Sequence, residues 1–141
     1  MKEKTIAGFI QIDDDLINNM ICGQVIRDVL PDVDILSFTD PETGLSYILS
    51  VYEDPAARNV IVYLDINMPT LSGWEVLEKL NVFPPSVKQK VRIFMLSSSI
   101  DPQDKRRASE NPLVNGYIEK PLTTIQVHRT LEEANIEPLQ K

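Results

Sequence analysis

The stretch FIQIDDDLINN, from Phe9 to Asn19, places three consecutive carboxylates directly after an apolar run. Like charges at such short separation repel, and each raises the pKa of its neighbours. The sequence therefore predicts that a cation lies beside Asp13 and Asp14 in the folded protein. Asp15 has a simpler interpretation, because an aspartate just before a helical pattern commonly caps that helix at the positive end of its dipole.

Four more apolar runs follow along the chain, separated by segments with helical periodicity or by loops. Short apolar runs are typical of strands, and their alternation with helices favours βαβ units around a parallel sheet. The chain is therefore expected to belong to the α/β class. The five expected strands are AGFIQI (7–12), VDILSF (33–38), NVIVYL (59–64), VRIFML (91–96) and LVNGYI (113–118).

Helical periodicity or capping patterns mark the segments that separate these runs. Apolar residues recur at every fourth position from Ile17 to Val29, which predicts an amphipathic helix whose apolar face covers the sheet. Further on, Asp101 is expected to cap a short polar helix, and Thr123 or Thr124 is expected to cap the last one. The five expected helices cover residues 16–30, 41–52, 73–80, 101–111 and 123–134.

Polar residues follow four of the expected strands. Asp13 and Asp14 follow the first, Asp65 the third, Ser97 the fourth, and Lys120 lies just beyond the fifth. The carboxyl ends of parallel strands share one edge of a sheet, and ligands bind there where the strand order reverses. In a flavodoxin-like (βα)5 three-layer sandwich, with a five-stranded sheet of order 2-1-3-4-5, the first and third strands are neighbours. The three aspartates are therefore expected to converge.

A cluster of carboxylates restricts the kind of ligand that this edge can hold. Hard oxygen ligands favour Mg²⁺ or Mn²⁺ over zinc or copper. Magnesium with few protein ligands usually occurs where a phosphoryl group supplies further oxygens. The Lys120 ammonium and the Ser97 hydroxyl are suited to hold such oxygens. The sequence thus predicts metal-assisted phosphoryl chemistry.

Four fragments in this order resemble the receiver domain of two-component response regulators, in particular the stand-alone, chemotaxis-regulator-like type. They are IDDD (12–15), YLDINMPTLSGWE (63–75), FMLSSS (94–99) and GYIEKPL (116–122). Their order and spacing are similar to those of the family from about Phe9 to about Ala134. The resemblance implies a signalling phosphoacceptor rather than an enzyme with its own substrate.

The resemblance also implies roles for single residues. Asp65 would be the phosphoacceptor, which attacks a phosphoryl group carried by a histidine kinase, a histidine phosphotransfer protein or a small donor. Asp14 and Asp65 would ligate Mg²⁺ directly, and Asp13 would act mostly through water. The backbone carbonyl of Asn67 would complete the protein's share of the ligands, and Lys120 would pair with the phosphoryl oxygens.

Further implied roles concern switching. The Ser97 hydroxyl would bond the phosphoryl group, although threonine is more frequent at this position, and Ser98 stands where alanine is common. Tyr117 stands where the family carries its switching aromatic. The change would reach the face built from the fourth helix, the fifth strand and the fifth helix. The family often has a cis bond before the proline that corresponds to Pro121, next to Lys120.

The length of the chain indicates one receiver domain over residues 1–141. Its core is expected at about 6–135, and residues 136–141 are expected to form a short tail. Segments 53–59 and 81–90 contain proline or charge without periodicity, and surface loops are expected there.

Composition narrows the choice of partners. A formal charge of −7 and a pI near 4.7 argue against a nucleic acid or a membrane as partner. A single cysteine, Cys22, excludes an internal disulfide, and with one histidine the chain offers no zinc cluster. The N-terminus does not resemble a signal peptide. We expect a cytoplasmic monomer or weak dimer that signals to a downstream protein the sequence does not identify.

Two alternatives remain open at this stage. A phosphatase of the haloacid-dehalogenase class also carries D-x-D after its first strand, with Asp13 as its nucleophile and Asp15 as the second acid. A phosphorylation-independent scaffold would keep the receiver shape without its chemistry. The substitution Asp65→Asn separates the three, because only the receiver loses phosphorylation through it.

Overall fold

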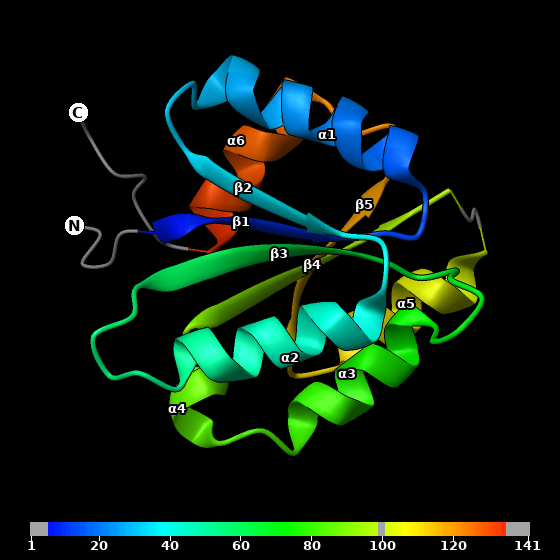
Figure 1. The fold of residues 1–141 in the computed structure, drawn as a ribbon. Helices are drawn as coiled ribbons and strands as arrows, with labels where there is room; N and C mark the ends of the chain where they lie inside the picture. Colours follow the sequence, from blue (N-terminus) through cyan, green and yellow to red (C-terminus); the bar gives the residue numbers. More distant parts are fainter. Residues whose placement is uncertain (1–5, 99–100, 135–141) are drawn as a thin grey trace.

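The computed structural model describes residues 6–98 and 101–134 (Figure 1). The expected tail at 136–141 lies outside these residues. Within them the strands are β1 (Ile6–Ile12), β2 (Asp34–Phe38), β3 (Asn59–Asp65), β4 (Val91–Ser97) and β5 (Val114–Glu119). The helices are α1 (Leu16–Val29), α2 (Pro41–Tyr52), α3 (Gly73–Asn81), α4 (Pro85–Lys88), α5 (Pro102–Glu110) and α6 (Thr124–Glu133).

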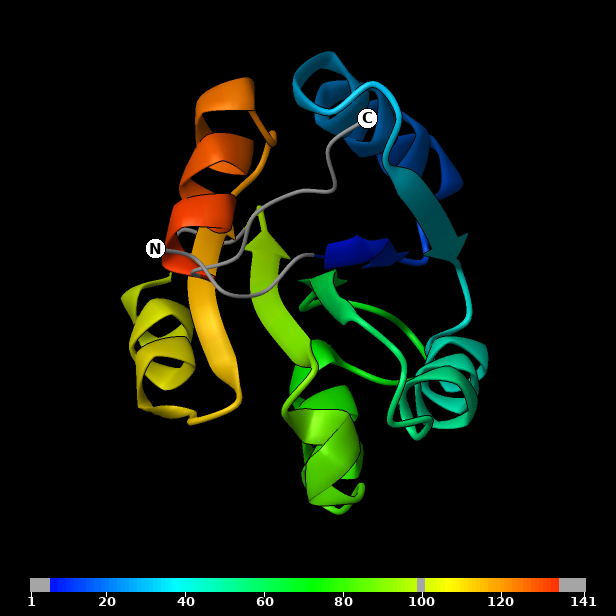
Figure 2. The ribbon, with the colours of Figure 1, turned by 90° about the vertical axis from the view of Figure 1, so that its left-hand side faces the viewer.

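The five strands form one parallel sheet in the order β2-β1-β3-β4-β5. Helices α1 and α6 lie on one face, and α2 to α5 lie on the other (Figure 2). This is the predicted flavodoxin-like three-layer sandwich. In such a sheet every strand needs a crossover to reach its parallel neighbour, and the helices that make the crossovers cover both faces.

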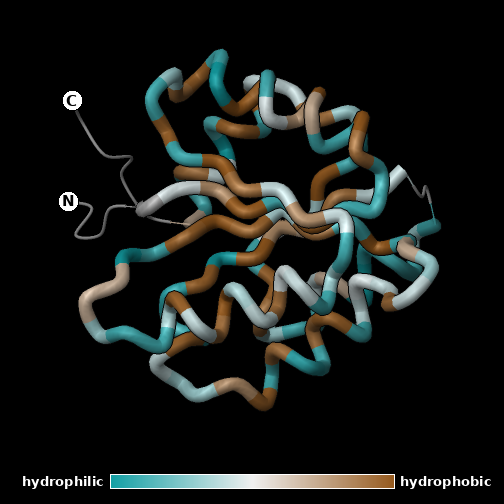
Figure 3. The backbone as a smooth tube through the Cα atoms, in the orientation of Figure 1, coloured by the Kyte–Doolittle hydropathy of each residue, from teal (hydrophilic) through white to brown (hydrophobic). Residues whose placement is uncertain are grey.

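Side chains alternate along β3 between two apolar cores. Val62 and Leu64 pack with α2 and α3, whereas Ile61 and Tyr63 pack with α1 and α6. Successive side chains of a strand point to opposite faces, so a central strand needs apolar residues at nearly every position. In Figure 3 the strands in the middle of the molecule are coloured mostly as hydrophobic. The buried Tyr63 hydroxyl is paired with the Thr130 hydroxyl of α6 at 2.8 Å.

The buried face of α1 differs from the predicted one. Ile17 and Ile21 are 67% and 53% exposed, whereas Ile26 is fully buried, together with Asn19, Cys22 and Gly23. The cause is polar: the Asn19 side chain donates to the backbone carbonyl of Asp13 at 3.0 Å, and the Asn19 carbonyl accepts from Gln11 at 3.0 Å. These bonds turn the Asn19 side of the helix toward the sheet.

Segment 81–90, predicted as a surface loop, contains the one-turn helix α4. Pro85 occupies its first turn, where the missing N–H of proline costs nothing. Val87 is fully buried and joins the core beneath α2. One turn is too short to show helical periodicity, so the pattern of the sequence did not reveal it.

Candidate functional site

Three carboxylates meet at the carboxyl ends of the central strands. Ile12 of β1 lies opposite Leu64 of β3, so the next residues, Asp13 and Asp65, leave the sheet at the same level. Ligand oxygens of Asp13, Asp14 and Asp65 all lie within 4.8 Å of one another. The predicted convergence of the three aspartates is therefore confirmed.

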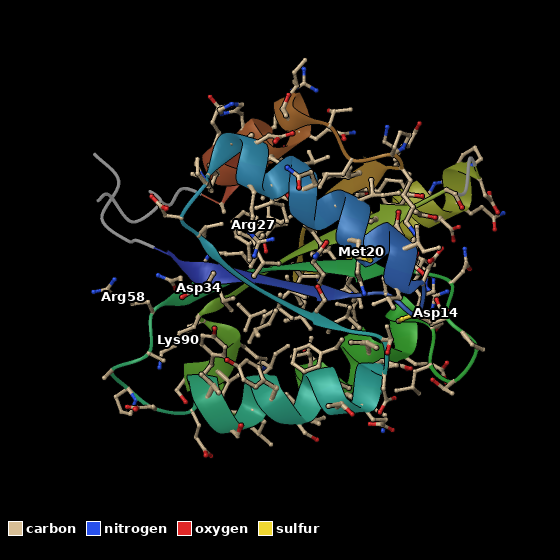
Figure 4. The ribbon with its side chains drawn as sticks, turned by 45° about the horizontal axis from the view of Figure 1, so that its top comes forward. Asp14, Met20, Arg27, Asp34, Arg58 and Lys90 are labelled. Atoms are coloured by element: carbon tan, nitrogen blue, oxygen red, sulfur yellow. The ribbon has the colours of Figure 1, made fainter. Side chains whose placement is uncertain are left out.

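The two aspartates at the strand ends are buried, and Asp14 is exposed. Asp13 and Asp65 are 5% and 6% exposed. Asp14 lies in the short connection between β1 and α1, at the opposite end of the sheet from Asp34 and Arg58 (Figure 4). The site thus has an enclosed floor and a side that is open to solvent.

Lys120 crosses from the end of β5 to this cluster. Its Nζ lies 3.0 Å from Asp13 Oδ2 and 3.0 Å from Asp65 Oδ1. Its backbone N–H donates to the carbonyl of Ser97, the last residue of β4, at 2.9 Å. The peptide bond between Lys120 and Pro121 is cis, which the resemblance to the receiver family implied. The lysine is therefore fixed to the neighbouring strand while its ammonium bridges two carboxylates.

Burial and charge act against each other within the cluster. Burial raises the pKa of Asp65, the negative charge of Asp13 raises it further, and Lys120 opposes both. Burial alone would lower the pKa of Lys120, but its bonds to Asp13 and Asp65 outweigh this and raise it. Three carboxylates against one ammonium leave two uncompensated negative charges. An added cation would offset them.

The first turn of α1 reaches back to Asp13. Asp13 Oδ1 accepts from the backbone N–H of Asp15 at 2.9 Å, and Oδ2 accepts from Asn18 Nδ2 at 2.6 Å. The Asn19 side chain donates to the backbone carbonyl of Asp13. Asp15 caps the helix as predicted, because its carboxylate accepts from the backbone N–H groups of the second and third helical residues. The sequence reasoning did not identify Asn18 or Asn19. The feature of the sequence that could have identified them is their position in the first helical turn after the acidic triplet.

The donor set fits Mg²⁺ or Mn²⁺. Every candidate ligand atom in the cluster is a carboxylate oxygen, which is what these hard cations prefer. The exposed side at Asp14 leaves room for the waters that Mg²⁺ retains in proteins. The residues present are thus compatible with the predicted ion.

Residues 9–132 match the family model described as the response regulator receiver domain. The chain belongs to this family. A comparison with curated proteins finds no match.

Solved structures of other receivers share the fold. A two component response regulator from Cytophaga hutchinsonii is 29% identical, with 92% of this chain and 97% of that chain covered and a TM-score of 0.82. A response regulator receiver protein from Dyadobacter fermentans is 22% identical, covering 92% and 98%, with a TM-score of 0.83. The chemotaxis protein CheY4 of Vibrio cholerae is 19% identical, covering 91% and 98%, with a TM-score of 0.71.

The other expected site residues of this receiver lie on β4, on β5 and in the loop that follows β3. Ser97 is fully buried and comes one residue after Leu96, which lies opposite Asp65. Tyr117 of β5 is half-buried, and Asn67, with an exposed side chain, follows Asp65 by two positions. Their functional roles stay predictions. Within the described part of the chain, no helix is long and apolar enough to cross a membrane.

Proposed function

We propose that residues 1–141 act as a single receiver domain that accepts a phosphoryl group on Asp65. The donor is a phosphohistidine of a histidine kinase or of a histidine phosphotransfer protein. One observation carries the proposal: the buried Asp65 carboxylate lies 3.0 Å from the Lys120 ammonium, within a cluster of three carboxylates at the carboxyl edge of the sheet. A nucleophilic carboxylate beside a fixed cation is suited to attack a phosphoryl group.

The transfer exchanges one bond to phosphorus for another. An oxygen of Asp65 attacks the phosphorus, an O–P bond forms, and the N–P bond to the donor imidazole breaks. The leaving nitrogen takes up a proton from solvent. Lys120 already contacts Asp65 and offsets charge on the transferred group. The product is an acyl phosphate on the protein, so the chain is a substrate of phosphotransfer rather than an enzyme with turnover on others.

The metal ion in this proposal is Mg²⁺ or Mn²⁺. Asp14, Asp65 and the backbone carbonyl of Asn67 would hold it, and Asp13 would act through water. When bound, the ion neutralises phosphoryl oxygens and orients the group for attack.

Switching follows from the new charge on Asp65. The hydroxyl of Ser97, at the end of the next strand, bonds the phosphoryl group, and Tyr117 changes its packing in response. Tyr117 is part of the face of α5, β5 and α6, and Ser97 lies on the neighbouring strand β4. This face corresponds to the fourth helix, fifth strand and fifth helix of the sequence prediction. A downstream protein reads this face. Nucleic acid and membrane are not its partners, and the domain works as a cytoplasmic monomer or weak dimer.

An exposed apolar patch beside the site supports a protein as phosphodonor. Four of its side chains lie on α1, where Figure 4 labels Met20, and one lies at the start of α6, which contacts α1. Exposed apolar groups that gather beside a reactive site are typical of protein contact surfaces. The patch consists of Leu16, Ile17, Met20, Ile21 and Ile125.

Intact-protein mass spectrometry with acetyl phosphate tests the proposal. The wild-type chain should gain one phosphoryl group in the presence of Mg²⁺ and none in EDTA. The Asp65→Asn variant should gain none. The matched variant Asp32→Asn, which changes an exposed aspartate far from β3 in sequence, should behave as wild type.

Other results would favour the alternatives. Phosphorylation of Asp65→Asn would point to another acceptor, as in a phosphatase that uses Asp13. Failure of the wild type both to react with acetyl phosphate and to bind beryllofluoride with Mg²⁺ would favour a phosphorylation-independent scaffold. The match of residues 9–132 to the receiver family favours the receiver over the phosphatase.

A further inference from the structure

Asn18 makes a short hydrogen bond to the acidic cluster from outside it. It lies in the first turn of α1, its side chain is partly buried, and its Nδ2 is 2.6 Å from Asp13 Oδ2. An ionised carboxylate can only accept hydrogen bonds, so the amide nitrogen of Asn18 must face it. The amide therefore has one orientation at the site.

The bonds to Asp13 leave little of its carboxylate unused. Oδ2 accepts from Asn18 and from Lys120, which occupies both of its lone pairs. Oδ1 accepts from the backbone N–H of Asp15, which leaves one lone pair. That remaining position is the one through which Asp13 can accept from a water of a bound ion. The direction in which it points depends on how the carboxylate plane is held.

We propose that Asn18 is a positioning residue that sets the Mg²⁺ affinity of the site by fixing the carboxylate plane of Asp13. Without the amide, Oδ2 keeps only Lys120, and the carboxylate can rotate to share both oxygens with the ammonium. Asp13 would then be turned away from the ion. Groups that orient a metal site from the outer shell typically change metal affinity by 10-fold or more when removed. The inference rests on the proposed function, because it takes Mg²⁺ as the ion.

The position of Asn18 gives this role a second consequence. Ile17 and Ile21 are its neighbours on α1, and both belong to the exposed apolar patch. The same helical turn therefore carries part of the exposed apolar patch and a hydrogen-bond donor to Asp13. A protein that shifts this turn on docking would change the geometry of the metal site.

Isothermal titration with MgCl₂ alone tests the proposal on four variants of the full chain. Asn18→Leu keeps a similar shape without polar atoms, and Asn18→Ala is a second variant in case the first fails to fold. Gln24→Leu is the matched control, because Gln24 is exposed on the same helix and its amide bonds Asp28 instead. Thermal unfolding in EDTA, run in parallel, measures any general loss of structure.

The expected result is a Mg²⁺ affinity that is about 10-fold weaker in Asn18→Leu and Asn18→Ala and unchanged in Gln24→Leu. Asn18→Gln, which keeps the amide on a longer stem, should recover part of the loss. Equal or tighter Mg²⁺ binding in the Asn18 variants would overturn the proposal while the proposed function stands. If the wild type itself binds no Mg²⁺, both fail, so the two failures are distinguishable.

Discussion

Asp65 carries its charge in a buried position, where Asp13 repels it and Lys120 attracts it. Its pKa is raised as a result, because burial and the like charge outweigh the lysine. An isolated carboxylate in this position would favour its neutral form. A cation that binds the ionised form offsets the cost of ionising this buried carboxylate. The raised pKa of Asp65 and the affinity of the site for a metal ion therefore depend on each other.

The pH dependence of Mg²⁺ binding follows from that raised pKa. The ion needs ionised carboxylates, so protons compete with it as the pH falls through the pKa of Asp65. We expect affinity to be nearly constant around neutral pH and then to fall at a higher pH than for an ordinary aspartate. The slope should approach about tenfold per pH unit. Lys120 stays charged throughout, because its pKa is raised. Calorimetric titration between about pH 8 and about pH 4 measures this, and an affinity that does not change would contradict it.

Single residues also show what the sequence could and could not reveal about the site. Asp13, Asp14, Asp65 and Lys120 could be placed together because parallel strands end at one edge, and their positions along the chain mark those ends. Asn18 could not be placed. Its contact depends on the phase of α1 about its axis, and that phase is set by bonds to Gln11 and Asp13 that apolar periodicity does not report.

At the scale of elements, α1 shows how polar contacts decide the orientation of a helix. The stripe from Ile17 to Val29 satisfies the amphipathic pattern, yet its first half faces solvent, because Asn19 is bonded to β1 and to the residue that follows it. By contrast, the strands could be predicted almost to the residue. A parallel strand that is buried on both faces appears in the sequence as an uninterrupted apolar run. Its position does not depend on which side faces the core, so polar contacts do not change the prediction.

Two substitutions of the same kind on α1 test this orientation. Ile21→Ser changes a side chain that is 53% exposed, and we expect the free energy of unfolding to change by about 0.5 kcal/mol or less. Ile26→Ser places a hydroxyl in the core and should cost roughly 3 kcal/mol or more. Urea titration followed by circular dichroism gives both values. Similar losses in the two variants would contradict the orientation described above.

Helix α3 depends on glycine for its close approach to the end of β3. The N–H of Gly73 donates to the Ile66 carbonyl at 2.7 Å, and a Cβ at this position would lie 2.6 Å from the carbonyl oxygen of Asp65. Gly73→Ala must therefore displace the loop after β3. We expect a loss of stability of about 1–3 kcal/mol and slower phosphorylation by acetyl phosphate.

Gly23→Ala is the matched control for this change. Gly23 lies inside α1, and a Cβ there would make only an ordinary contact, 3.5 Å from Gln11. Alanine has the higher helix propensity, so this variant should gain up to about 1 kcal/mol. Chemical denaturation gives the stability of the Gly73→Ala and Gly23→Ala variants, and the rate of phosphorylation by acetyl phosphate is measured for both. A Gly73 variant with the stability and rate of wild type would show that the close approach is not required.

At the scale of the whole molecule, an acidic chain of net charge −7 concentrates two uncompensated negative charges at one edge of its sheet. The parallel sheet forces this arrangement, because β1 and β3 are neighbours and end at the same level. Folding therefore brings together carboxylates that are far apart in the unfolded chain. The ionised site costs stability that a bound divalent cation can restore.

Mg²⁺ should accordingly stabilise the entire domain. An ion that binds only the folded state adds about 2.7 kcal/mol when its concentration is 100 times the dissociation constant. We expect the midpoint of thermal unfolding to rise with MgCl₂ and to rise much less in Asp14→Asn. NaCl at matched ionic strength is the control for general screening. An equal rise with NaCl would mean that the cluster does not bind the ion.

The most direct test of the central claim locates the phosphoryl group on the chain. Borohydride reduces an aspartyl acyl phosphate to the alcohol homoserine, which peptide mass spectrometry can assign to a position. After treatment with acetyl phosphate and Mg²⁺, we predict homoserine at position 65 and unchanged aspartate at positions 13 and 14. Reduction at position 13, or at no position in a chain that has gained a phosphoryl group, would contradict the assignment of Asp65 as the phosphoacceptor.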